Sequence, residues 1–137
     1  MRVIKFRGFT TLLKHNVWNY GFLVGNRICD KVIDKSGFEF YNDVDPESIG
    51  QFTGVYDYTK NEIYEGDILQ DMKNQGETKY KVIYEPYIAC FCLVNIDSPE
   101  YSMDLSKFQV KTKNLLVVSN VFDESAILKL KSENRSH

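Results

Sequence analysis

The chain has 137 residues and a mass of 16.0 kDa, which fits one compact domain with at most one subdomain and excludes a large multidomain machine. Its composition, 43% hydrophobic and 26% charged, is that of a folded globule and excludes prevailing disorder. A formal net charge of −2 provides no general attraction to nucleic acid or to an anionic membrane, so any such contact has to be local.

No run of about 18 apolar residues occurs, and no long apolar segment follows Met1. We therefore expect neither a membrane span nor a secretory signal, no membrane partner, and a cytoplasmic location. Cys29, Cys90 and Cys92 are odd in number and lack a familiar metal-ligand spacing. Such cysteines favour a reducing compartment over a disulfide framework, and we expect no cofactor.

Residue types that favour strands dominate the chain: Val, Ile, Thr, Phe, Tyr and Trp make up 47 residues, against two alanines. The sequence therefore predicts a mainly β fold, with α+β as the alternative label. We expect one domain over residues 1–130, built from an N-terminal antiparallel meander, a small SH3-like barrel and a short C-terminal helix. Residues 131–137 are expected to form a flexible tail.

The first forty residues predict the meander. The expected strands are 2–7, 17–24, 28–33 and 38–41. We expect Gly8 to end the first strand, Gly25-Asn26 to form a hairpin turn, and residues 34–37 to form the next turn.

A short helix is expected to start at Asp45-Pro46-Glu47, because aspartate caps a helix and proline suits its first turn. Gly50 is expected to stop it. Two extended pieces should follow, over residues 51–54 and 55–64, the second interrupted by a polar loop at 57–61.

Glu65-Gly66-Asp67 predicts a tight turn into a hairpin of residues 68–72 and 79–85. Residues 88–94 are apolar throughout, which indicates a strand buried on both faces. The remaining expectations are a loop at 97–106 with a helical turn at 104–107, a strand at 115–118, and a helix at 124–130 capped by Asp123 or Ser119.

Four blocks of these residues resemble the YopX-like family of small phage and prophage proteins. The blocks are Ile4-Lys5-Phe6-Arg7-Gly8, Trp18-Asn19-Tyr20-Gly21, residues 46–54 resumed at 62–69, and residues 118–124. The last block departs from the family pattern at Ser119 and Ser125, where glycine and proline are expected. The resemblance implies a protein of Gram-positive phages or prophages and higher-order assembly for some members, but it implies no reaction.

Two clusters could in principle hold a metal ion. Glu62, Glu65 and Asp67 could converge on a hard cation, although a purely structural turn is the favoured interpretation. Cys90 and Cys92 should share one face of a strand, where a soft metal could bridge them; the favoured interpretation is two small hydrophobic side chains. His15 and His137 are the only histidines, so we predict no catalytic relay and no metal site.

For partners, the leading hypothesis is protein contact through tyrosines in predicted turns, which are Tyr56, Tyr58, Tyr87 and Tyr101. We expect a non-enzymatic interaction module that forms homo-oligomers or binds another protein. The alternative is a nucleic-acid-binding accessory factor of phage DNA metabolism, in which Lys79, Tyr80 and Lys81 contact phosphates and bases. The competing interpretation of that strip is a solvated strand face.

Overall fold

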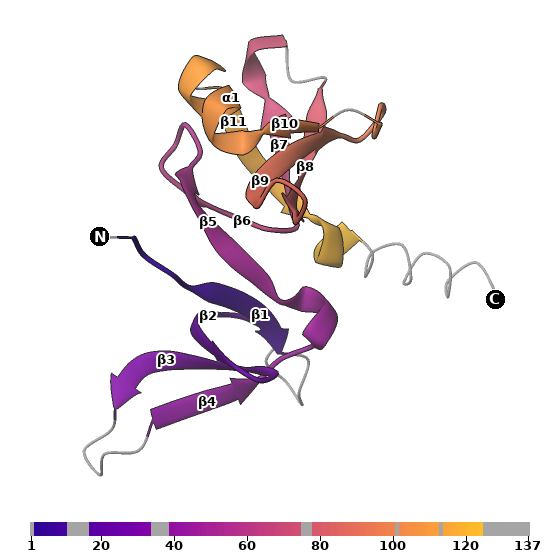
Figure 1. Ribbon diagram of the computed structural model, residues 1–137. Coiled ribbons are helices and arrows are strands. Elements are labelled where there is room, and N and C mark those ends of the chain that lie inside the picture. The colour runs from indigo at the N-terminus through magenta and orange to yellow at the C-terminus, as the bar shows by residue number, and fades with distance from the viewer. Residues whose placement is uncertain are drawn as a thin grey trace, which may run out of the picture. The chain divides into compact units, whose positions relative to one another are not determined.

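The computed structural model describes residues 2–10, 17–33, 39–74, 78–100, 102–112 and 114–124. Strands make up most of these residues, so the predicted mainly β fold is confirmed (Figure 1). The chain divides into two compact units, Met1–Gly54 and Val55–His137. The single domain expected over residues 1–130 stays a prediction, and each unit is described by itself.

The first unit is an antiparallel meander, as predicted (Figure 1). Its strands lie side by side in the order β4-β3-β2-β1-β5. They are β1 (Phe6–Thr10), β2 (Val17–Val24), β3 (Arg27–Ile33), β4 (Glu39–Asp43) and β5 (Gly50–Tyr56), the last two residues of which belong to the second unit. The hairpin turn at Gly25-Asn26 is confirmed, whereas the predicted turn at 34–37 lies outside the described residues.

The prediction that Gly8 ends the first strand is wrong, because Gly8 lies in the middle of β1, opposite Asn19 of β2. A Cβ atom on Gly8 would lie 2.6 Å from Cγ2 of Val44, too close for any side chain. The strand therefore needs a glycine at this point for close packing against the segment after β4, a contact that no local pattern reveals.

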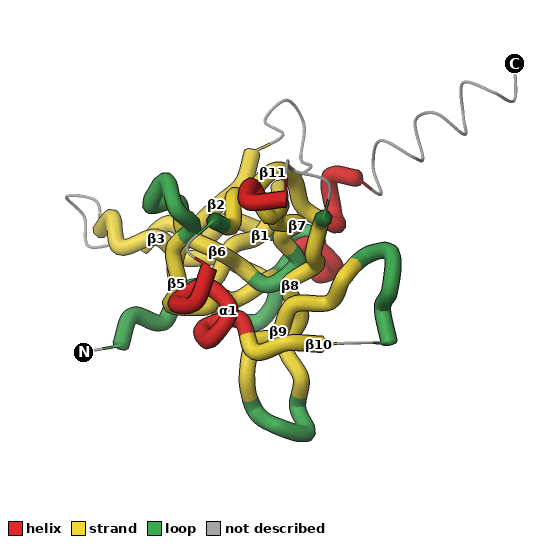
Figure 2. Tube along the Cα trace, turned by 90° about the horizontal axis from the view of Figure 1, so that it is seen from above, coloured by secondary structure: helices red, strands yellow, loops and turns green. Residues whose placement is uncertain are grey.

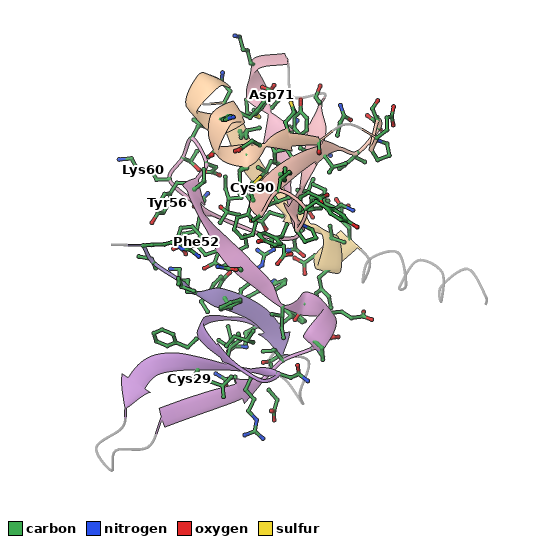
Figure 3. The ribbon with its side chains drawn as sticks, viewed as in Figure 1. Cys29, Phe52, Tyr56, Lys60, Asp71 and Cys90 are labelled. Atoms are coloured by element: carbon green, nitrogen blue, oxygen red, sulfur yellow. The ribbon has the colours of Figure 1, made fainter. Side chains whose placement is uncertain are left out.

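The predicted helix start at Asp45 is confirmed as a short 3-10 helix, Pro46–Ser48. Oδ1 of Asp45 accepts a hydrogen bond from the backbone N–H of Glu47 at 3.0 Å. The helix ends before Gly50, where β5 begins. On β5, Phe52 is buried and its N–H donates to the carbonyl of Lys5 at 2.8 Å (Figure 3).

The second unit contains an antiparallel sheet in the order β10-β9-β8-β7-β11 (Figure 1). The members are β7 (Asp67–Asp71), β8 (Lys79–Glu85), β9 (Cys90–Asn95), β10 (Ser102–Asp104) and β11 (Leu115–Asn120). Short β6 (Glu62–Tyr64) precedes β7 and neighbours β5. The predicted hairpin of 68–72 and 79–85 is confirmed by the pairing of β7 with β8. Within the described ranges the sheet is open, with β10 and β11 at its edges, so the expected SH3-like closure is not seen there.

Two predictions around β9 are corrected. The strand begins at Cys90 instead of residue 88, because residues 86–89 form a turn in which Ala89 has φ of +50°. The expected loop at 97–106 contains β10, whereas the helical turn expected at 104–107 is confirmed as the start of helix α1 (Leu105–Thr112). Asp104 begins that helix, since its Oδ1 accepts the N–H of Ser106 at 3.0 Å.

The core of the second unit combines side chains of the sheet, of β6 and of α1. Helix α1 lies beside β9 and β10 (Figure 2). Alternate residues of β8 and β9 face inward because side chains alternate across a strand. The fully or nearly fully buried members are Ile63, Leu69, Val82, Leu93, Leu105 and Leu115. The ring of Tyr80 joins them and lies 5.4 Å from the ring of Phe108 on α1, between centroids.

The chain after β11 begins a helical turn at residues 121–124. Its cap is Asn120, neither Ser119 nor Asp123 as predicted. Oδ1 of Asn120 accepts the N–H of Asp123 at 2.7 Å, and its Nδ2 donates to Oδ2 of Asp123 at 2.7 Å. The predicted helix beyond Glu124 and the predicted tail lie outside the described residues.

Candidate functional site

One face of the β1–β2 pair gathers aromatic side chains around a single arginine. The register places Arg7 opposite Tyr20 and Phe9 opposite Trp18. Directly opposite residues of an antiparallel pair share a face, as do alternate residues of one strand. We define the aromatic face as Arg7, Phe9, Trp18, Tyr20, Phe22 and Val24.

Part of the aromatic face is tightly packed, and part of it is exposed to solvent. The rings of Phe9 and Trp18 meet edge to face with centroids 5.3 Å apart. The guanidinium carbon of Arg7 lies 4.6 Å from the centroid of Trp18, which is a cation–π contact, and Arg7 is only 7% exposed. By contrast, Tyr20 and Phe22 are 48% and 46% exposed. Ordered aromatic groups therefore face solvent on a fixed sheet.

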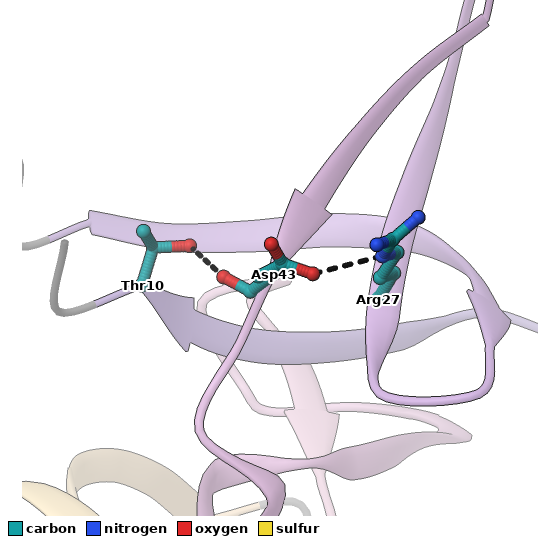
Figure 4. A network of polar contacts seen from close by, with 3 residues as sticks. All are labelled: Thr10, Arg27 and Asp43. Carbon is teal, nitrogen blue, oxygen red and sulfur yellow. Dashed lines mark hydrogen bonds and ion pairs between the residues drawn. The ribbon is translucent and has the colours of Figure 1, made fainter.

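Polar contacts between strands also hold this sheet together. Nε of Arg27 on β3 lies 2.8 Å from Oδ1 of Asp43 on β4 (Figure 4). The hydroxyl of Thr10 on β1 donates to the backbone carbonyl of Asp43 at 2.8 Å. Asp43 thus links β4 to both β3 and β1, which are not neighbours of each other in the sheet order.

The aromatic face is not among the sites that the sequence predicts. Its signal was present in the alternation of Trp18, Tyr20 and Phe22 along β2. The contribution of β1 was hidden, because a strand ending at Gly8 would not place Phe9 beside Trp18.

The tyrosines predicted as contact residues are exposed where the structure describes them. Tyr56, the last residue of β5, is 48% exposed, and Tyr58, in the loop that includes Lys60, is 54% exposed (Figure 3). Tyr87 is 94% exposed, in the turn between β8 and β9. Tyr101 lies outside the described residues. A role for these tyrosines in binding stays a prediction.

A buried carboxylate fixes the loop that follows Tyr56 and carries Tyr58. Oδ1 of Asp57 accepts the N–H groups of Thr59 and Asn61, both at 2.9 Å, and the hydroxyl of Thr59 at 2.8 Å. Its Oδ2 accepts the N–H of Val117 on β11 at 3.0 Å. Burial acts to raise the pKa of Asp57, but these hydrogen bonds outweigh it and hold the pKa below its ordinary value.

The predicted nucleic-acid strip is divided between two faces of β8. Lys79 and Lys81 are exposed, whereas Tyr80 is 8% exposed and packs into the core. Successive residues of a strand point to opposite faces, so the tyrosine ring does not lie beside the two lysines for base stacking. Contact of the lysines with phosphates stays a prediction.

The Glu65-Gly66-Asp67 turn has a structural role. Gly66 has φ of +92°, donates its N–H to the carbonyl of Val82 at 2.9 Å, and accepts the N–H of Val121 at 2.8 Å. Oδ2 of Asp67 accepts the N–H of Tyr64 at 2.8 Å. Within the described ranges, no three His, Cys, Asp or Glu residues are grouped so that they could hold a metal ion.

A shallow groove of about 250 Å³ lies on the second unit. Its lining residues are Ile68, Lys81, Val94, Asn95, Ile96, Pro99, Val121 and Glu124. The volume is below the roughly 300–1,000 Å³ typical of small-molecule sites. Among the helices of the described segments, none is long and apolar enough to cross a bilayer.

The strands and their surface features define a mainly β protein of two compact units, one of which displays an aromatic sheet face. The chain belongs to the YopX family: the family model described as YopX protein matches residues 5–129. The resemblance found in the sequence is therefore confirmed, and its blocks lie in the strands and turns described above. No curated protein matches the chain. The phage origin stays a prediction.

Proposed function

We propose that this protein is a non-enzymatic interaction module that binds protein through the aromatic face, with a second copy of the chain as its first partner. The observation that carries the proposal is the row of Tyr20, Phe22 and Val24, each about half exposed on one face of β2. Trp, Tyr and Arg are the residue types most enriched at the energetic centres of protein interfaces. The face combines these types with a fixed backbone.

The energetic gain of covering this face is sizeable. Complete burial of a large apolar side chain contributes about 1.5–3 kcal/mol, so covering the exposed half of each of these three contributes about 1 kcal/mol apiece. Arg7 and Trp18 are already packed together and lose little side-chain entropy on binding.

Self-association is consistent with the symmetry of most oligomers and with the charge of the chain. A two-fold interface uses the same patch on both copies, and an aromatic patch can pack against itself. The formal net charge of −2 gives little repulsion between copies.

Multi-angle light scattering of the purified chain at several concentrations tests this proposal. We expect the molar mass of the wild type to rise with protein concentration. The molar mass of the double variant Tyr20→Ser, Phe22→Ser should stay at the value of a monomer. Val118→Ser removes a side chain of similar exposure, 40%, from β11 and should leave the wild-type behaviour unchanged. A wild type that stays monomeric at high concentration contradicts self-association.

Nucleic-acid binding is a second candidate, favoured by the exposure of Lys79 and Lys81 on β8. Mobility shift of single- and double-stranded DNA at two salt concentrations tests it, because phosphate contacts weaken steeply as salt rises. A shift at low salt that Lys79→Ala, Lys81→Ala abolishes supports this candidate. Absence of any shift at low salt removes it.

A further inference from the structure

The shallow groove of the second unit has a floor that crosses three strands. The register places Lys81 of β8 opposite Ile68 of β7 and opposite Val94 of β9. Directly opposite residues share a face, so these three side chains form one row across the sheet. This face is the one opposite to Tyr80 and the core, because successive residues of a strand point to opposite faces. Ile68 and Val94 are buried and Lys81 is exposed, so the floor presents one cation between two apolar side chains.

Two short segments form the walls of the groove, and backbone hydrogen bonds fix both. One wall follows β9 and includes Ile96 and Pro99; the N–H of Ile96 donates to the carbonyl of Lys79 at 3.1 Å. The other wall follows β11 and includes Val121 and Glu124. The N–H of Val121 donates to a carbonyl of the turn before β7 at 2.8 Å. Because both walls are tied to the sheet, the groove is formed in advance and a ligand has little of the chain to order.

Two opposite charges line this otherwise mainly apolar groove. Lys81 provides a cation on the floor and Glu124 an anion on one wall, and both side chains are exposed. Within the segments that the structure describes, neither side chain has an ion-pair or hydrogen-bond partner. Ile96 and Val121 are 45% and 37% exposed, so the walls also offer apolar surface that a ligand can cover. The groove is therefore complementary to a ligand that carries a negative group, a positive group and an apolar body.

The size of the groove limits this ligand. Its volume is about 250 Å³. A cavity of about 150 Å³ is enough to hold benzene, whereas drug-sized ligands occupy roughly 300–1,000 Å³. The groove thus suits a molecule with one ring or one branched chain. A free α-amino acid with an apolar side chain has this size, and its carboxylate and ammonium groups supply both charges from a single carbon atom.

We propose that the groove binds a free α-amino acid whose apolar side chain has the size of leucine or phenylalanine. Nζ of Lys81 pairs with the carboxylate of the ligand, and the carboxylate of Glu124 pairs with its ammonium group. The side chain of the ligand covers Ile96, Pro99 and Val121. Binding is non-covalent, so no bond forms or breaks. The site belongs to the second unit and does not depend on the aromatic face.

Titration of the isotopically labelled full chain with L-leucine tests this proposal, with backbone amide shifts followed by heteronuclear NMR. We expect saturable shifts at residues 94–96 and 121–124 and a Kd on the order of 1 mM, as is usual for so small a ligand. Three probes each lack one recognised part: leucinamide lacks the carboxylate, isocaproate lacks the ammonium group, and glycine lacks the apolar side chain. Each should bind at least about fivefold more weakly than leucine.

Substitutions locate the site on the chain. Lys81→Gln and Glu124→Gln should each weaken the binding of leucine about fivefold. In Lys81→Gln, leucine and leucinamide should bind equally, because the partner of the carboxylate is gone. The matched control is Lys79→Gln, which removes the same charge from an exposed residue of β8 outside the groove and should keep the wild-type affinity.

The proposal is overturned if leucine causes no saturable shifts at concentrations far above the expected Kd, or if leucinamide, isocaproate or glycine binds as tightly as leucine. Equal weakening by Lys79→Gln and Lys81→Gln also overturns it. A wild type that stays monomeric in light scattering refutes self-association through the aromatic face and leaves these expectations unchanged, so the two proposals fail separately.

Discussion

The carboxylate of Asp57 gives the sharpest test of how the second unit is held together. It is 4% exposed and accepts four hydrogen bonds, one of which joins the β5–β6 loop to β11 across 60 residues of sequence. The perturbation is Asp57→Asn, which preserves shape and removes the charge. If the amide oxygen takes the place of Oδ1, the amide nitrogen faces the N–H of Val117, so a donor meets a donor.

The size of the effect follows from these contacts. A hydrogen bond to a charged group contributes about 1.5–3 kcal/mol net, and one such bond is lost outright in the asparagine variant. We therefore expect Asp57→Asn to lower the free energy of unfolding by about 2 kcal/mol at pH 7, roughly 30-fold in the equilibrium constant. Asp57→Ala removes all four hydrogen bonds that the carboxylate accepts and should lower the free energy of unfolding by about 4 kcal/mol.

The pH dependence has a definite sign. Because the folded-state pKa of Asp57 lies below its ordinary value of 3.8, the folded state resists protonation more than the unfolded state does. The stabilisation is fully present above that ordinary value and is lost as the pH falls through the folded pKa. Asparagine does not titrate, so the difference between wild type and Asp57→Asn should shrink on acidification.

Urea unfolding followed by circular dichroism at pH 7 and at several values below pH 4 measures both effects. Asp97→Asn makes the same chemical change on an exposed residue and should alter stability by less than about 0.5 kcal/mol. If Asp57→Asn is as stable as the wild type at pH 7, or if its deficit persists unchanged in acid, the assigned role of the carboxylate is wrong.

Three further substitutions and one control test other contacts by urea unfolding at pH 7. Gly8→Ala should destabilise the first unit by about 1–3 kcal/mol through collision with Val44; unchanged stability would mean that the close approach is not real. Asn120→Ala should lower the free energy of unfolding by about 1 kcal/mol, because the helical turn at residues 121–124 loses its cap. Ser119→Ala should change it little, and equal decreases for the two variants would contradict the assignment of the cap. Arg27→Ala breaks an ion pair with Asp43 whose side chains are 59% and 62% exposed, so it should change the free energy of unfolding little. A decrease of more than about 1 kcal/mol would refute this expectation.

The sequence predicted those elements whose signal is local. β2 and the β7–β8 hairpin follow from alternating side chains and turn residues, and the 3-10 helix follows from an aspartate–proline start. These patterns act over a few residues, so one sequence is enough to read them.

The errors arose where distant residues decide the structure. The extent of β1 depends on Val44, and the start of β9 depends on an alanine with positive φ at residue 89. The aromatic face needs the pairing of β1 with β2, and the burial of Tyr80 needs its packing against Phe108. None of these contacts can be read from the neighbouring residues alone, and the candidate site depended on them more than the fold did.

The contact between Arg7 and Trp18 also has a practical consequence. The chain has a single tryptophan, so all of its indole fluorescence comes from a ring that lies under a guanidinium on the aromatic face. The molecule carries its own optical reporter there, and a partner that settles on this surface will change the emission without any label.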